Sequence, residues 1–90
     1  MKRAPALVAL ALLAACAGGG KLMTRQEVIK QDIDKARKSG AERCAPKELA
    51  LAEANADFAS REISLGMGGE AESHLKVAED NVHRAIEASK

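Results

Sequence analysis

Two stretches of the chain, residues 46–65 and 70–89, repeat small or apolar residues at steps of three and four. This spacing places the repeated residues on one side of an α-helix, so each stretch is predicted to be an amphipathic helix. The residues between them, 66–69, read Gly-Met-Gly-Gly and interrupt the helical pattern. Two helices of about 30 Å joined by so short a loop form an antiparallel hairpin. The predicted fold class is therefore all-α.

The repeated residues define the expected seam of this hairpin. Most of them are alanines, which let two helix backbones approach closely while each side chain buries little apolar area. The two stripes are Leu49, Ala52, Ala56, Ala59 and Ile63 on the first helix, and Ala71, Leu75, Ala78, Val82 and Ala85 on the second. We expect these two stripes to pack against each other.

The helix over 46–65 carries a second apolar stripe, formed by Leu51, Ala54, Phe58 and Leu65. It lies roughly opposite the seam because an offset of two residues corresponds to about 200° of helical rotation. We expect a preceding helix to cover it, which would place the helix over 46–65 in the middle of a three-helix layer or bundle. A partner protein is the alternative cover, so Leu51, Phe58 and Leu65 form the predicted partner surface.

The preceding helix is predicted over residues 24–38. Thr24 and Glu27 have the spacing of a capping box, in which each side chain satisfies a backbone donor of the first turn. The helix should end near Lys38, with Gly40 as a left-handed cap. The expected helical domain is 24–90, with helices at about 24–38, 46–65 and 70–89.

The start of the chain has the layout of an export signal. Lys2 and Arg3 precede an uncharged stretch, 4–20, that ends in three glycines. Its apolar part, 4–15, has the length of a signal-peptide core and is well short of the roughly 20 residues of a membrane-spanning helix. Residues 1–15 are therefore predicted to be a cleaved signal peptide.

The residues at the expected cleavage site, Leu13, Ala14, Ala15 and Cys16, resemble the lipobox of bacterial lipoproteins at all four positions. The resemblance implies that Cys16 carries a diacylglycerol thioether, becomes the N-terminus and is acylated on its amine, for example with palmitate. Two or more acyl chains hold a protein stably on a bilayer. Ala17, where an aspartate commonly signals inner-membrane retention, resembles the outer-membrane pattern. Residues 16–23 would then be a lipidated cysteine and a flexible tether, with the domain facing the periplasm.

Charge and cysteine content narrow the possible partners. Without residues 1–15 the chain has 12 Lys and Arg against 13 Asp and Glu, a net charge of about minus one. The chain therefore lacks the excess of basic residues that would indicate a nucleic-acid partner. With Cys16 blocked by lipid, Cys44 is the only free thiol, which excludes an internal disulfide. Cys44 is either buried or forms a disulfide to another chain.

Residues 44–90 resemble a known helical segment. The stretches CAPKELALAEANADFASREISLG and EAESHLKVAEDNVHRAIEASK are similar to the segment between the lipid anchor and the peptidoglycan-binding domain of some OmpA-family outer-membrane lipoproteins. The sequence ends where that domain would follow, so peptidoglycan binding is carried over to no residue. The small residues Ala59, Ala71 and Ala78 also resemble a tetratricopeptide (TPR) hairpin. A single hairpin of this kind needs a covering helix or a partner.

No catalytic or metal-binding set is apparent in the sequence. His74 and His83 lie about 180° apart on their helix and cannot share a metal ion. Cys44 has no convincing base and orienting partner for nucleophilic catalysis. We therefore expect no enzyme activity, no metal, no small-molecule substrate and no cofactor beyond the covalent lipid on Cys16.

The terminal Lys90 suggests a different role. In Braun's lipoprotein, which this chain resembles in size, anchor and last residue, the terminal lysine is joined to peptidoglycan. This chain differs by having Pro46 and a glycine loop instead of one continuous helix. The leading hypothesis is a small outer-membrane lipoprotein that acts as a structural or protein-interaction module, by self-association or with another envelope protein. The alternatives are a pilotin-type subunit of an assembly or secretion complex, and attachment to the wall through Lys90.

Overall fold

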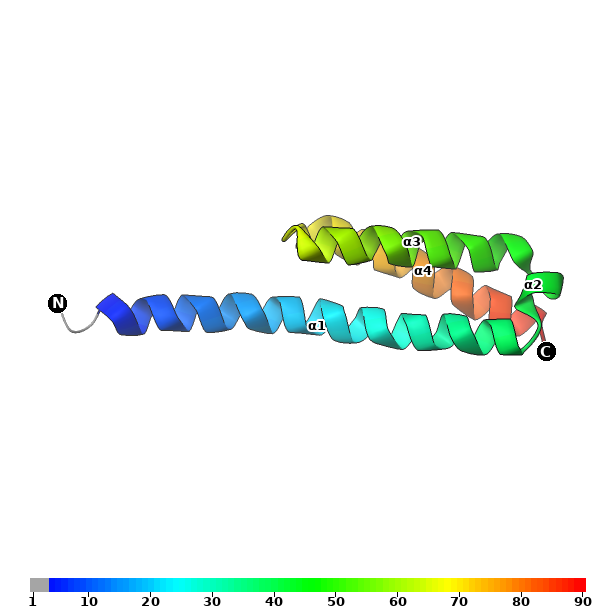
Figure 1. Ribbon diagram of the computed structural model, residues 1–90, viewed down its shortest axis with the longest axis horizontal. Coiled ribbons are helices and arrows are strands. Elements are labelled where there is room, and N and C mark those ends of the chain that lie inside the picture. Colours follow the sequence, from blue (N-terminus) through cyan, green and yellow to red (C-terminus); the bar gives the residue numbers. More distant parts are fainter. Residues whose placement is uncertain (1–3) are drawn as a thin grey trace.

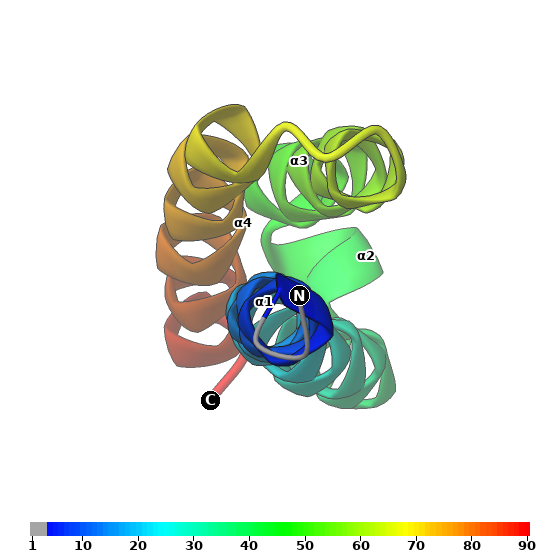
Figure 2. The same cartoon turned by 90° about the vertical axis from the view of Figure 1, so that its left-hand side faces the viewer.

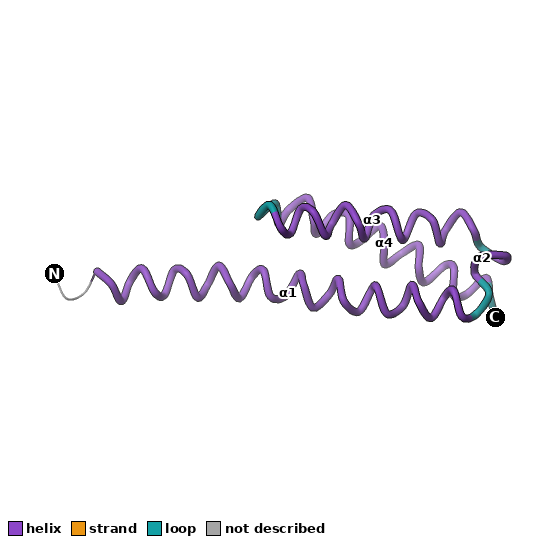
Figure 3. The backbone as a smooth tube through the Cα atoms, in the orientation of Figure 1, coloured by secondary structure: helices purple, strands orange, loops and turns teal. Residues whose placement is uncertain are grey.

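A computed structural model of the chain describes the backbone of residues 4–90 and the side chains of residues 20–90. This part of the chain contains four helices and no strand (Figures 1 and 3). They are α1 (Ala4–Lys38), α2 (Ala41–Cys44), α3 (Pro46–Ser64) and α4 (Gly68–Ala88). The predicted all-α class and the predicted hairpin are confirmed.

The three long helices form a bundle with α2 closing one end. Seen along the bundle, α1, α3 and α4 occupy the three corners of a triangle (Figure 2). Helices α3 and α4 are the antiparallel pair, and α1 contacts both of them. The N-terminal part of α1 projects beyond the turn between α3 and α4, so the molecule is elongated, with extents of 63 × 17 × 14 Å (Figure 1).

The core follows the predicted seam. Nine of its ten members are buried, and Ile63 is partly buried against them. Helix α1 adds Ile29, Ile33 and Ala36 to this core. Helix α1 contacts both α3 and α4, and these three residues belong to the same buried cluster as the seam.

The second stripe on α3 is not covered, so the prediction that α1 lies over it is wrong. Leu51, Phe58 and Leu65 are 39%, 46% and 73% exposed. Helix α1 instead contacts α3 near Ala56, whose carbonyl accepts a hydrogen bond of 3.4 Å from the Gln26 side chain. Packing in the groove buries α1 against two helices, whereas the back of α3 would offer it only one.

The predicted start of the first helix is also wrong. Thr24 lies inside α1, and its hydroxyl donates a hydrogen bond of 2.9 Å to the carbonyl of Gly20, four residues earlier. It therefore caps no helix, and residues 20–23, expected in the tether, are helical. The predicted end is confirmed: α1 stops at Lys38, and Gly40 follows with a φ of 95°.

The short helix α2 was not predicted, and it decides the environment of Cys44. Ala41 and Ala45, four residues apart, are 0% and 2% exposed and attach this segment to the core. Cys44 lies directly before Ala45 in the sequence and is exposed. The expectation of a buried cysteine is therefore wrong, because Ala45 occupies the buried position beside it.

Candidate interaction surface

The hairpin presents an uncovered apolar surface, here called the outer face. It consists of Leu51 and Phe58 of α3, Leu65 directly after α3, and His74 and Val77 of α4. Phe58 lies two residues from Ala56, hence about 200° around α3 from the side that contacts α1. Val77 is 42% exposed. Four of the seven large apolar side chains that are exposed within residues 20–90 belong to this face.

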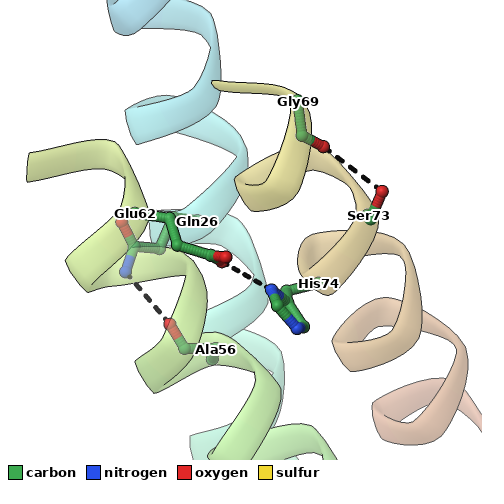
Figure 4. Close-up of polar contacts among 6 residues, drawn as sticks. All are labelled: Gln26, Ala56, Glu62, Gly69, Ser73 and His74. Atoms are coloured by element: carbon green, nitrogen blue, oxygen red, sulfur yellow. Dashed lines mark hydrogen bonds and ion pairs between the residues drawn. The ribbon is translucent and has the colours of Figure 1, made fainter. Parts of the chain in front are cut away.

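Phe58 and His74 form the centre of the outer face. Their ring centroids are 5.4 Å apart and the rings are tilted by 50°, an arrangement typical of favourable aromatic pairs. The Nδ1 atom of His74 lies 2.5 Å from Oε1 of Glu62, a hydrogen bond that joins α4 to α3 (Figure 4). The side chain of Glu62 is only 14% exposed. The two helices are therefore held together at this level by one aromatic and one polar contact.

The register of the hairpin brings these residues together. Phe58 lies eight residues before Gly66, and His74 lies eight residues after it. Gly66 has a φ of 74°, which a residue with a Cβ rarely adopts, and it reverses the chain without lengthening the loop. A turn centred on Gly66 therefore places Phe58 and His74 at the same height.

A pocket of about 280 Å³ opens at this centre. It is lined by Phe58, Arg61, Glu62 and His74, and most of its lining is apolar. Its lining residues carry a phenyl ring, an imidazole, a guanidinium and a carboxylate. A mostly apolar site with a few polar groups fits an apolar side chain of another polypeptide.

The histidine, thiol and carboxylate groups of the described residues do not gather at one place. Within residues 20–90, no three His, Cys, Asp or Glu side chains gather as metal ligands. The pair His74 and Glu62 lies toward the end of the bundle with the turn, whereas Cys44 precedes α3 at the opposite end. These groups are not brought together.

Two other predicted site residues, Cys44 at the end of α2 and Lys90 after α4, belong to the end of the bundle where α2 contacts α4. Cys44 is an exposed free thiol, so its disulfide to another chain stays a prediction. Lys90 is exposed and forms an ion pair of 3.0 Å with Glu87. Its attachment to the wall likewise stays a prediction. The lipobox residues Leu13, Ala14, Ala15 and Cys16 lie outside the residues whose side chains the structure describes.

Two polar residues of the bundle were not identified from the sequence. Gln26 is 7% exposed and joins α1 to α3 through its hydrogen bond to the carbonyl of Ala56. Glu62 was not considered as the partner of His74. The signal was available, because Glu62 lies four residues after Phe58 and therefore on the same side of α3.

Comparisons with protein-family models, curated proteins and solved structures found no match. In the described part of the chain, none of the helices combines the length and the apolar run that crossing a bilayer requires.

Proposed function

We propose that this chain is a small outer-membrane lipoprotein whose helical bundle is an interaction module in the periplasm. The anchor would be lipid on Cys16, supported by the four-residue lipobox pattern and the short uncharged stretch before it. The OmpA-family likeness of residues 44–90 supports the same compartment. No catalytic role is part of this proposal.

The observation that carries the interaction role is the outer face. Burial of apolar surface is the main favourable term in protein association. Phe58 leaves 46% of its surface exposed although α1 packs two residues away on the same helix. An aromatic ring beside a pocket is the kind of residue that dominates binding at protein interfaces.

Replacing Cys16 tests the anchor. In cells that express the full chain, Cys16→Ser is expected to abolish labelling by radioactive palmitate and to prevent cleavage at residue 15. The matched control, Cys44→Ser, should keep both the label and the membrane fraction. A Cys16→Ser chain that is still processed and still sediments with the outer membrane would overturn the lipoprotein assignment.

Photo-cross-linking tests the interaction role. A photoreactive amino acid at position 58 of the full chain should capture a protein in intact cells. The same probe at Val28, which is 51% exposed on α1, is the control and should capture far less. Equal capture at both positions, or none at 58, would remove the outer face as the interaction surface. Recovery of an envelope assembly or secretion subunit would favour the accessory-subunit alternative.

A further inference from the structure

We infer that the outer face is occupied by a second copy of this chain, with the two α3 helices packed antiparallel around a two-fold axis at Phe58. This inference rests on the proposed interaction role of the same face. The inference goes beyond that role by naming the partner and its orientation.

The spacing of the apolar residues on α3 supports a two-fold axis. Leu51 and Leu65 lie seven residues before and seven residues after Phe58, about 10.5 Å in each direction along the helix. An axis perpendicular to α3 at Phe58 therefore places Leu51 of each copy against Leu65 of the other. A two-fold interface requires a surface that is complementary to itself, and this stripe meets that requirement.

The pocket beside Phe58 supports the same arrangement. It is lined by Phe58, Arg61, Glu62 and His74, so it lies directly next to the proposed axis. In the antiparallel dimer the Phe58 ring of each copy enters the pocket of the other. The exposed part of each ring would then be buried against His74 and the second Phe58, and aromatic pairs of this kind are favourable.

Charges on the flank of α3 are complementary in this orientation. Asp57 and Arg61 are exposed on the same side of the helix and form no ion pair within residues 20–90. They lie one residue before and three residues after Phe58. The two-fold axis therefore places Asp57 of one copy about 3 Å, measured along the helix, from both Arg61 and Asp57 of the other, so the two attractions between Asp57 and Arg61 outnumber the one repulsion between the carboxylates. Two symmetric ion pairs would form.

A parallel dimer fits these observations less well. With the axis parallel to α3 and beside Phe58, the two Phe58 rings also meet, but the flanks that carry Asp57 and Arg61 lie on opposite sides of the interface. These residues then form no ion pair between the copies. The antiparallel dimer keeps the two flanks on the same side and lets their charges pair.

The antiparallel dimer also separates the two Cys44 thiols. Each lies 14 residues from the axis, so they are about 40 Å apart and cannot form a disulfide. The two Cys16 anchors would leave at opposite ends, because α1 projects beyond the turn in each copy (Figure 1). Such a dimer lies along the membrane surface.

Cysteine cross-linking in the full-length Cys44→Ser chain tests the inference. Cells would express single-cysteine variants under two epitope tags, and isolated envelopes would be oxidised with copper phenanthroline. We expect Phe58→Cys to cross-link to itself. We also expect Leu51→Cys to cross-link to Leu65→Cys when the two are co-expressed, but neither to cross-link to itself. Cys44→Ser without an added cysteine gives the background from Cys16, and Val28→Cys is the exposed control.

The outcomes separate this inference from the proposed function. A dimer of Leu51→Cys with itself, or no dimer at Phe58→Cys, would overturn the antiparallel arrangement. If position 58 captures a different envelope protein and no second copy, the interaction role stands and this inference fails. If it captures nothing, both fail.

Charge reversal on the flank provides a second test that does not depend on cysteine chemistry. Asp57→Arg and Arg61→Asp, each alone, should reduce the Phe58→Cys cross-link about tenfold, because two exposed ion pairs become repulsive. The double charge swap should restore it, since it exchanges the partners of each pair. Circular dichroism of the purified full-length variants would confirm that all remain folded. A double swap that stays as weak as the single reversals would overturn the inference.

Discussion

Leu75 shows how much this small core depends on single side chains. It is 0% exposed, and most of its neighbours on the seam are alanines, which have no longer side chain to move into a vacated space. Within residues 20–90, only Ile29, Leu75 and Val82 are both large and almost completely buried. The loss of any one of them removes a large share of the apolar area that holds the bundle together.

We therefore expect Leu75→Ala to lower the free energy of unfolding by about 3 kcal/mol, because it leaves a cavity between alanines. Small domains have total stabilities of about 5 kcal/mol at the low end, so much of the helical signal should be lost at 37 °C. Urea unfolding of the full chain, followed by circular dichroism at 222 nm, measures the change. Leu65→Ala is the control: Leu65 is 73% exposed, and its replacement should change the stability by less than about 0.5 kcal/mol. Equal losses would show that the bundle buries Leu65 in solution.

At the scale of the elements, two glycines fix how the helices are connected. Gly40, between α1 and α2, and Gly66, between α3 and α4, have φ angles of 95° and 74°. Residues with a Cβ adopt such angles at a cost of about 1 kcal/mol or more. Gly69 lies in the first turn of α4 without a positive φ, and a Cβ there would meet no atom within 4 Å.

The φ angles of these glycines predict that replacement by alanine destabilises the protein at positions 40 and 66 but not at position 69. Gly40→Ala and Gly66→Ala should each lower the free energy of unfolding by about 1 kcal/mol, since the alanine is strained in the folded state. Gly69→Ala should leave it unchanged or raise it by up to about 1 kcal/mol, because alanine favours the helix and restricts the unfolded chain. Thermal unfolding of the three full-length variants tests this. A Gly66→Ala variant as stable as the original would mean that the turn adopts another conformation.

The sequence predicted these elements to different extents, for physical reasons. The seam and the hairpin follow from side-chain spacing along each helix, which is local information, and α3 begins at Pro46 as expected. The position of α1 depends on competition between the back of α3 and the groove between α3 and α4, and spacing does not rank those two sites. Thr24 has the sequence of a cap, yet its hydroxyl also satisfies a carbonyl one turn earlier. Sequence patterns within one helix therefore decide neither where α1 packs nor whether Thr24 caps a helix.

The outer face could likewise be predicted from the sequence only in part. Leu51, Phe58 and Leu65 were predicted as one surface because seven-residue spacing keeps them on one side of α3. The contact of Phe58 with His74, and the bond from His74 to Glu62, depend on the hairpin register, which becomes definite only once the turn is centred on Gly66. The environment of Cys44 depended on a single turn of helix, α2, too short to give a periodic signal.

At the scale of the whole molecule, the bundle has one core shared by three helices. Ile29 and Ile33 of α1 lie in the same buried cluster as Leu75 and Val82 of α4. The ion pairs between α1 and the hairpin are solvent-exposed and contribute little, for example Arg37 with Glu53 at 2.9 Å. Small domains with one core usually unfold in a single step. Helix α1 is thus expected to be part of the folded unit and not a separate attachment to the hairpin.

Native-state hydrogen exchange of the full chain tests this unity. Ile33→Ala removes buried area only on α1, where Ile33 is 6% exposed, and should cost about 2 to 4 kcal/mol. If the bundle opens as one unit, the most protected amides of α3 and α4 lose protection by the same free energy as those of α1. The matched control, Val28→Ala, changes an exposed residue of the same helix and should leave all amides unchanged. Faster exchange confined to α1 would show instead that the hairpin is stable without it, and that the shared core is not what keeps α3 and α4 folded.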